Sequence, residues 1–291
     1  MPRPQTIQIY LPAGDPRGMR VAEITTRIVR VLEVPRSQLS NFFKMPEALQ
    51  VGVYFLIGEL SDSGLPRVYI GQSGNVGKRL AHHNQDTNRG KDFWNRALVV
   101  VSLTNSMTQT HALFLEWFAI GQATQAGRYS LENGNVGARP HTPSPLEADC
   151  HEIHETAAIL LATLGQPIFE SLTHPMSVQG ARELFYCMAS GANGIGEYTS
   201  EGFVILKDSK ARLEIAESKK GSRLEETRAR LIAEGVVVLN GDALVFSRDY
   251  LMTSPSAASS LLMGRSSNGW IDWKDGAGKT MAELKRQAPI V

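Results

Sequence analysis

The chain has 291 residues, of which 42% are hydrophobic, and this is long enough for two domains with hydrophobic cores. Its formal net charge is +1 and its pI is about 7.8, so no overall basic excess indicates a nucleic-acid-binding protein, and any such surface must be local. The two cysteines are too few for a disulfide framework and no segment approaches the roughly 20 apolar residues of a membrane span, so we expect a soluble, cytoplasmic protein without a membrane partner.

The chain opens with a β-rich segment over residues 1–50. Strand-like runs occupy residues 7–11, 20–24 and 28–34, and a turn rich in proline and glycine separates the first two. Residues 37–49 are then predicted to form a short helix. We expect an extension that precedes the main domain, and a covering sheet without chemistry of its own is one interpretation of it.

Two apolar, β-branched and aromatic runs follow at residues 51–57 and 67–71, and they predict a β-hairpin. Residues 61–64 between them supply the serine, aspartate and glycine of a turn. Tyr54 and Tyr69 would then lie near each other on paired strands. Because tyrosines on paired strands usually pack in the core or at its rim, this pair alone indicates catalysis only weakly.

Residues 72–83 pass from a turn into a predicted short helix, with Ser73 or Asn75 as its cap. Arg79 and His83 are one helical turn apart and share a face of this helix. A guanidinium that binds phosphate beside an imidazole that exchanges a proton suits phosphodiester chemistry. The simpler alternative is a solvated basic helix face.

Basic residues gather around this helix and provide a candidate surface for nucleic acid: Lys78, Arg79, His82, His83, Arg89, Lys91 and Arg96. Phe93 and Trp94 lie among them. Such rings can stack on bases, although two adjacent aromatic residues more often bury at least one ring in the core.

Glu116 is the only charged residue within the apolar run 112–120. A carboxylate among apolar side chains is costly to bury unless it meets a cation, a metal ion or several hydrogen-bond donors. The helix could equally be amphipathic, with Glu116 on its exposed side. The local sequence leaves both interpretations open.

In their order along the chain, these residues resemble the GIY-YIG nuclease family. The two tripeptides are Gly52-Val53-Tyr54 and Tyr69-Ile70-Gly71, with valine in place of the usual isoleucine and a somewhat long loop between them. The resemblance implies an α+β domain over residues 51–171, in which helices flank a small central antiparallel sheet. It also implies these catalytic residues: Tyr54, Tyr69, Arg79, His83, Glu116 and Asn133. Asn135 is the alternative to Asn133.

The chemistry that the resemblance implies is hydrolysis of DNA with one divalent ion, Mg²⁺ or Mn²⁺, held by Glu116. Tyr69 or Tyr54 would deprotonate the attacking water. Because a tyrosine pKa near 10 makes a poor base, cationic charge from Arg79 and the metal must favour the phenolate. Arg79 would also bind phosphate oxygens, and His83 would either position the tyrosine or move a proton.

Residues 172–291 are predicted to form a linker and a smaller α+β domain. The runs 203–206, 236–239 and 243–246 are typical of strands, and the alternately charged stretch 219–234 is typical of a helix. A small-residue helix after a serine-proline cap and a Gly-Trp-x-x-Trp-Lys element complete the chain, and we expect the tryptophans to form an aromatic core.

This C-terminal part is similar to a domain of unknown function that is often fused to GIY-YIG modules, and it resembles the RAMA domains of restriction and methylation systems. The likeness implies contact with DNA. Arg265 and Lys274 join Lys78, Arg79, His82 and Lys91 as candidate phosphate-binding residues.

The expected function is therefore that of a metal-dependent DNA endonuclease with an accessory DNA-contacting domain, in restriction or defence. The alternative is a GIY-YIG-fold module that binds nucleic acid or assembles without catalysis. Loss of a matched tyrosine, arginine or glutamate would favour that alternative, and all are present. RNA as a substrate and a homodimer as the assembly stay open.

Overall fold

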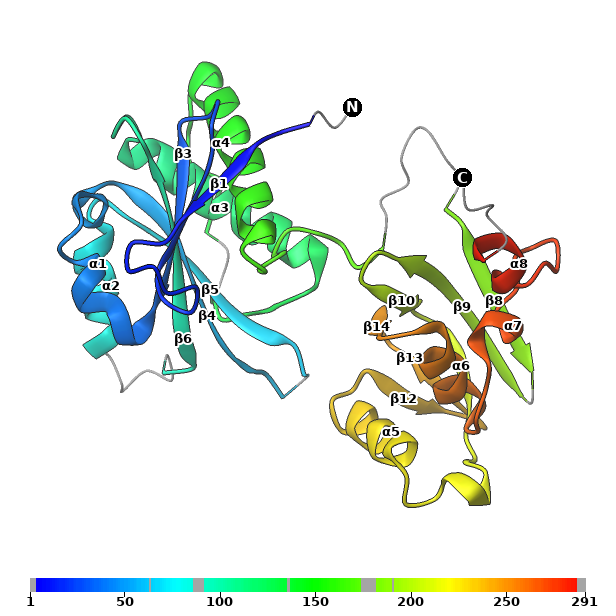
Figure 1. Cartoon of the computed structure of the whole chain (residues 1–291). Helices are drawn as coiled ribbons and strands as arrows, with labels where there is room; N and C mark the ends of the chain where they lie inside the picture. Colours follow the sequence, from blue (N-terminus) through cyan, green and yellow to red (C-terminus); the bar gives the residue numbers. More distant parts are fainter. Residues whose placement is uncertain are drawn as a thin grey trace. The chain divides into compact units, whose positions relative to one another are not determined.

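Two β-sheets, each with its own helices, give the described part of the chain an α+β fold (Figure 1). The computed structural model describes residues 4–62, 64–85, 92–134, 137–173, 182–189 and 191–286. The chain divides into two compact units, Met1–Glu170 and Ser171–Val291, which we call the first and the second unit. Within the described ranges, no helix is both long and apolar enough to cross a membrane.

The sheet of the first unit has seven strands: β1 Ile7–Tyr10, β2 Arg20–Ile24, β3 Val29–Pro35, β4 Gly52–Leu60, β5 Pro66–Ser73, β6 Trp94–Ser102 and β7 Ser130–Leu131. Their order is β1-β2-β3-β6-β4-β5-β7, and all neighbours are antiparallel except β5 and β7. The three predicted N-terminal strands are confirmed. Because β3 pairs with β6, these strands continue the same sheet as the predicted hairpin, which is β4 and β5.

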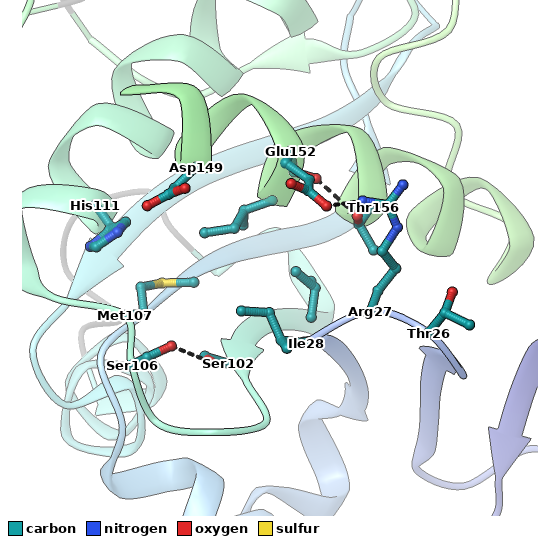
Figure 2. A pocket seen from close by; sticks show the side chains of 12 residues that line it. Thr26, Arg27, Ile28, Ser102, Ser106, Met107, His111, Asp149, Glu152 and Thr156 are labelled. Carbon is teal, nitrogen blue, oxygen red and sulfur yellow. Dashed lines mark hydrogen bonds and ion pairs between the residues drawn. The ribbon is translucent and has the colours of Figure 1, made fainter. Parts of the chain in front are cut away.

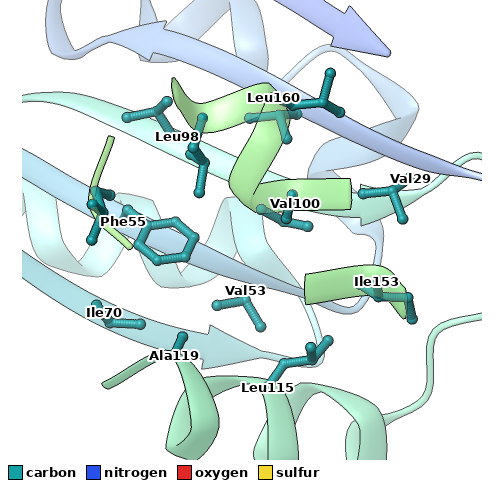
Figure 3. Close-up of a cluster of buried hydrophobic side chains, with 14 of the residues drawn as sticks. Val29, Val53, Phe55, Ile70, Leu98, Val100, Leu115, Ala119, Ile153 and Leu160 are labelled. Carbon is teal, nitrogen blue, oxygen red and sulfur yellow. The ribbon is translucent and has the colours of Figure 1, made fainter. Parts of the chain in front are cut away.

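The helical elements of the first unit are η1 Arg36–Gln38, α1 Leu39–Phe42, η2 Pro46–Leu49, α2 Val76–Gln85, α3 Gln109–Ala126 and α4 Ser144–Thr163, where η marks a 3-10 helix. Helices α3 and α4 pack on one face of the sheet, where Phe55, Leu115 and Leu160 lie in a shared core (Figure 3). The other face packs against α1 and α2 through Phe42 and Leu80. The central strands of the sheet are therefore buried on both faces.

The predicted helix over residues 37–49 is interrupted in the structure. It is divided into η1, α1 and η2, and Met45 between the last two has an extended backbone, with φ −84° and ψ 145°. Pro46 follows it, and a residue that precedes proline is disfavoured in the helical region.

Glu33 forms a buried ion-pair cluster in the middle of the sheet. Its side chain is fully buried on β3 and pairs with Arg20 of β2 and Arg96 of β6. A buried carboxylate is tolerated when cations and hydrogen bonds compensate its charge. Arg96, one of the basic residues noted in the sequence, is therefore used to join strands.

Phe93 and Trp94 both lie in the core, with 4% and 1% of their surface exposed. The guanidinium of Arg67 lies 4.7 Å from the ring centre of Phe93, and that of Arg36 lies 4.6 Å from the ring of Trp94. The possibility that these rings stack on bases is therefore wrong, and the usual alternative of burial holds for both.

The sheet of the second unit contains β8 Leu184–Ala189, β9 Ala192–Thr199, β10 Gly202–Ile205, β11 Lys210–Arg212, β12 Val237–Asn240, β13 Ala243–Phe246 and β14 Tyr250–Met252. Its order is β12-β13-β11-β9-β10-β14, and β8 also pairs with β9. The helical elements are η4 Glu217–Lys219, α5 Arg223–Ala233, α6 Pro255–Met263, α7 Gly269–Asp272 and α8 Met281–Lys285. The predicted strands and the charged helix are confirmed here.

Trp273 is at the centre of the second unit's core. It is fully buried, its ring lies 4.3 Å from that of Phe203, and its indole N–H donates to the carbonyl of Pro255 at 3.0 Å. The expectation that the Gly-Trp-x-x-Trp-Lys element supplies an aromatic core is confirmed for this residue. Trp270 is only half-buried and packs against Tyr198.

Candidate active site

The two tyrosines of the hairpin project to the same face of the sheet. Tyr54 lies opposite Gly71 and Tyr69 lies opposite Leu56, so the tyrosines are diagonal neighbours with ring centres 6.3 Å apart. A Cβ atom at Gly71 would lie 2.3 Å from the Tyr54 hydroxyl oxygen, which is closer than any real contact. The glycine after Ile70 therefore makes the space that the Tyr54 ring occupies.

Helix α2 is placed against this face by contacts at both of its ends. Asn75 caps its start by accepting a hydrogen bond from the Lys78 N–H at 2.9 Å, so of the two predicted caps Asn75 is the correct one. A Cβ atom at Gly77 would lie 2.8 Å from the carbonyl oxygen of Ala48, which shows how closely α2 approaches η2. At the other end, Arg36 donates to the Asn84 side chain at 2.8 Å.

The helix brings Arg79 and His83 to Tyr54. The Arg79 Nε–H donates to the Tyr54 hydroxyl at 3.2 Å, and that hydroxyl lies 2.8 Å from His83 Nε2. Tyr54 is fully buried and His83 is 5% exposed. Burial first, and then the neighbouring Tyr69, raise the pKa of Tyr54 well above its ordinary value, although Arg79 opposes the shift. The phenol of Tyr54 is therefore held in its protonated form.

Tyr69 lies at the outer side of the same group. It is half-buried, and its ring centre is 5.3 Å from that of His83. Hydrogen bonding to Tyr54 is the main cause of the raised pKa of Arg79, and a hydrogen bond to Tyr69 also contributes. Arg79 thus interacts with both tyrosines, while its side chain stays exposed to solvent.

Glu116 reaches the group from α3, around the outer edge of β5. The carboxylate is half-buried, and burial raises its pKa. The backbone N–H of Gln72 donates to it, and the positive charge of Arg79 is close enough to oppose the rise. Of the two interpretations that the sequence allowed, the structure thus supports a carboxylate that is compensated by a donor and a cation.

Three different hydrogen-bonding partners satisfy the backbone groups at the outer edge of β5 in succession. At Val68 the partner is the backbone directly after β7, where the Glu132 N–H donates to the Val68 carbonyl at 2.8 Å. At Ile70 it is the Asn133 side chain, whose amide accepts from the Ile70 N–H at 2.9 Å and donates to its carbonyl at 2.7 Å. At Gln72 it is the Glu116 carboxylate.

Asn133 is therefore bound to the strand that carries Tyr69, and its amide replaces one step of backbone pairing. Asn135, the alternative assignment, lies outside the described residues. Gln72 and Gln109 are not among the predicted site residues, and their side chains hydrogen-bond to each other at the same edge. Gln109 and Glu116 are seven residues apart and so share a face of α3, and this spacing was the available signal.

No preformed metal cage is present in the part of the chain that the structure describes, since no three His, Cys, Asp or Glu residues are grouped to hold an ion. Glu116 is a single, half-buried carboxylate. Such a ligand suits a hard cation that keeps most of its waters and meets substrate phosphate, which is the usual manner of Mg²⁺.

The predicted phosphate-binding residues are divided among several places. Lys78 and His82 are exposed on α2 beside Arg79, whereas Lys91 lies outside the described residues. Arg265 and Lys274 belong to the second unit. The guanidinium of Arg265 donates to the Ser266 carbonyl, and the Lys274 backbone pairs with Tyr186 while its side chain is exposed.

Comparison with known proteins gives a match within the second unit. Residues 185–285 match the family model described as a domain of unknown function, DUF4357, and this range includes the Gly-Trp-x-x-Trp-Lys element. No curated protein and no solved structure matches the chain.

Proposed function

We propose that the first unit is a divalent-metal-dependent endonuclease of the GIY-YIG type that hydrolyses DNA phosphodiester bonds. The observation that carries this proposal is the hydrogen-bonded group of Arg79, Tyr54 and His83, with Tyr69 and Glu116 beside it. These residues come from two strands and two helices, yet they meet at one edge of the sheet. A phenol, an imidazole, a guanidinium and a carboxylate together suit phosphoryl chemistry.

The two tyrosines have different roles in this proposal. Tyr54 is fully buried and held protonated, so it cannot accept a proton from water. The Tyr54 hydroxyl accepts a hydrogen bond from Arg79 and also hydrogen-bonds to His83 Nε2, so the Tyr54 and His83 side chains position each other. Tyr69 is half-buried and next to Arg79, so it is the tyrosine that activates the attacking water.

Arg79 binds the substrate phosphate. A guanidinium has five N–H donors, so its hydrogen bonds to the tyrosines leave others for non-bridging phosphate oxygens. Its pKa is raised by those tyrosine contacts, and it stays charged throughout the physiological range. The developing negative charge of the phosphate is therefore met by a fixed cation.

Glu116 is the residue that would hold Mg²⁺ or Mn²⁺, whose chemistry there is stabilisation of charge on the phosphate and the leaving oxygen. The N–H of Gln72 orients the carboxylate. The second unit would contribute DNA contacts through Arg265 and Lys274, and the setting of restriction or defence is inferred by analogy of domain architecture.

Nicking of supercoiled plasmid tests the proposal. Wild type is compared with Glu116→Gln and Tyr69→Phe in the presence of Mg²⁺ or Mn²⁺, on unmodified and modified DNA. Glu155→Gln and Tyr10→Phe are matched controls, because both residues are exposed and outside the site. We expect the site variants to lose at least 100-fold in nicking rate, as is common for groups that act on the transition state, and the controls to retain it.

Folded wild-type protein that cuts none of these substrates would contradict the proposal and favour the alternative, a module that binds nucleic acid without catalysis. Equal cutting by wild type and Glu116→Gln would refute the metal-binding role specifically. Matched DNA and RNA oligonucleotides in the same assay identify the preferred nucleic acid.

A further inference from the structure

A separate pocket opens in the first unit on the side of α3 and α4, and no residue of the candidate active site lines it (Figure 2). Its volume is about 410 Å³, which is within the range of small-molecule sites. The walls come from the turn before β3, the loop after β6, the first turn of α3 and the middle of α4. The segments that line the pocket are separated in the sequence and are brought together by the fold.

His111 is a buried polar group at one end of this pocket, with 8% of its surface exposed. Its Nδ1 accepts the Thr108 backbone N–H at 3.1 Å and lies 2.8 Å from the Thr108 hydroxyl. Burial also lowers the pKa of His111, so the ring is neutral at pH 7. With Nδ1 acting as an acceptor, the ring proton is on Nε2. Among the described residues, no side chain hydrogen-bonds to that Nε2.

Asp149 lies at the same end of the pocket as His111, and its charge acts on the imidazole (Figure 2). In the part of the chain that the structure describes, no ion pair engages Asp149. At the other end, Arg27 and Glu152 neutralise each other. The pocket therefore has a free N–H donor beside an unpaired carboxylate and a net charge of one negative.

The remaining walls are largely aliphatic. Ile28, Val29, Met107 and Ile153 line the space between the two polar ends. Aliphatic walls suit the faces of a flat ring, and a few convergent polar groups then fix its orientation. The edge of a bound ring must hydrogen-bond to both His111 and Asp149, so it needs an acceptor atom next to an N–H donor.

We propose that this pocket binds a nucleobase-like ring, which places a ring acceptor against His111 Nε2–H and a neighbouring amino or imino N–H against the Asp149 carboxylate. Adenine and cytosine have such an edge, because a ring nitrogen lies next to their exocyclic amino group. The negative charge of Asp149 opposes phosphate, so a free base or nucleoside is favoured over a base within a strand. This binding does not depend on the proposed nuclease function.

Calorimetric titration with adenosine and with cytidine tests the proposal on the full-length chain. Asp149→Asn removes the carboxylate at an exposed position. His111→Gln removes the imidazole but keeps a residue that completes the capping box with Thr108. We expect each variant to weaken binding at least tenfold, as for the loss of a hydrogen bond to a charged or buried group. Glu155→Gln, exposed on the same helix, is expected to bind like wild type.

A second comparison uses purine riboside, which is adenosine without its amino group, and we expect at least tenfold weaker binding of it to wild type. Competition by a single-stranded adenine oligonucleotide would show that the base comes from a strand, and no competition would show that it comes from free molecules. The absence of adenosine and cytidine binding to folded wild type at millimolar concentration would overturn the proposal. Binding that both pocket variants retain would overturn it as well.

Discussion

The ring of Tyr54 determines what residue 71 can be. Gly71 has an ordinary strand backbone without a positive φ. Conformational freedom therefore does not explain why residue 71 is a glycine. Space explains it, because a Cβ atom would lie 2.3 Å from the Tyr54 oxygen. A side chain there would displace the hydroxyl that contacts Arg79 and His83. Gly71 is thus part of the site geometry.

His154 makes the first unit sensitive to acid. Its ring packs between Phe118 and Phe169, with ring centres 4.8 and 4.4 Å away. Burial, together with the neighbouring His151, lowers its pKa from 6.5 to about 4. As the pH falls, His154 therefore binds a proton at a higher pH in the unfolded chain than in the folded chain. This contribution to stability is complete above pH 6.5 and is lost as the pH falls from 6.5 to 4.

We expect this histidine to cost the first unit up to about 2 kcal/mol of unfolding free energy between pH 7 and pH 5. Urea unfolding at the two pH values measures the loss. His154→Phe keeps an aromatic ring without a titrating group and should lose correspondingly less, whereas the exposed His141→Gln should behave like wild type. The same pH dependence in His154→Phe and wild type would show that another group is responsible.

Part of the candidate site could be predicted at this scale. The helical spacing of Arg79 and His83 and the hairpin of Tyr54 and Tyr69 are local patterns, and the structure brings these residues together. The bond of Glu116 to the Gln72 backbone could not be predicted, because it depends on how α3 lies along the sheet. The burial that distinguishes the two tyrosines likewise arises from tertiary packing.

Among the secondary-structure elements, β5 has an outer edge that β7 covers only in part. The two-residue β7 pairs with Arg67 and Val68, and the Asn133 side chain continues the pairing at Ile70. Unpaired strand edges can pair with other chains, so covering them protects a protein from association. The short β7 and Asn133 therefore act together as an edge strand.

Asn133→Asp tests this role, because it removes the amide donor to the Ile70 carbonyl and adds charge at nearly constant size. We expect the first unit to lose about 1–3 kcal/mol of unfolding free energy in urea titrations at pH 7. Asn95→Asp is the matched control, because Asn95 is exposed on β6. If the two variants were equally stable, the Asn133 amide would contribute nothing to the strand edge.

Strong local patterns predicted most of the elements. The N-terminal strands and the hairpin have clear strand patterns and clear turn residues. The strand β6 was not predicted. The basic and aromatic residues before it and at its start were interpreted as a binding surface. In the second unit, β9 contains several small residues and glycines, which have low strand propensity, and its pairing with β8 and β10 overrides that preference.

For the whole molecule, the main property is that each unit has a hydrophobic core of its own. The cores around Phe55 and around Tyr54 belong to the first unit, and the core around Trp273 belongs to the second. Units with separate cores are expected to unfold in separate transitions. A variant that is destabilised in one core should therefore leave the transition of the other unchanged.

The variant Arg228→Met tests for separate unfolding transitions by destabilising the second unit. Arg228 is 5% exposed. Its guanidinium donates to the carbonyls of Leu213, Leu261 and Leu262, and the last two residues lie near the end of α6. Burial lowers its pKa to about 10, so it stays charged at pH 7. We expect Arg228→Met to leave these carbonyls unpaired and to cost roughly 3 kcal/mol.

Differential scanning calorimetry should then show one transition shifted downwards and the other in place. Arg223→Met, at an exposed position of the same helix α5, should shift neither. A common shift of both transitions would mean that the two units unfold as one cooperative body.

The edge of β5 also has an evolutionary consequence. Under the proposed nuclease function, the hydrogen bond that Glu116 accepts from the Gln72 backbone means that selection for an intact sheet preserves an acceptor at this position even where selection for cleavage has ceased. A lineage that lost activity would retain glutamate at position 116 or replace it with glutamine. Tyr69 would be replaced by other residues earlier. In such lineages the identity of residue 69 would report on activity more faithfully than the acidic residue does.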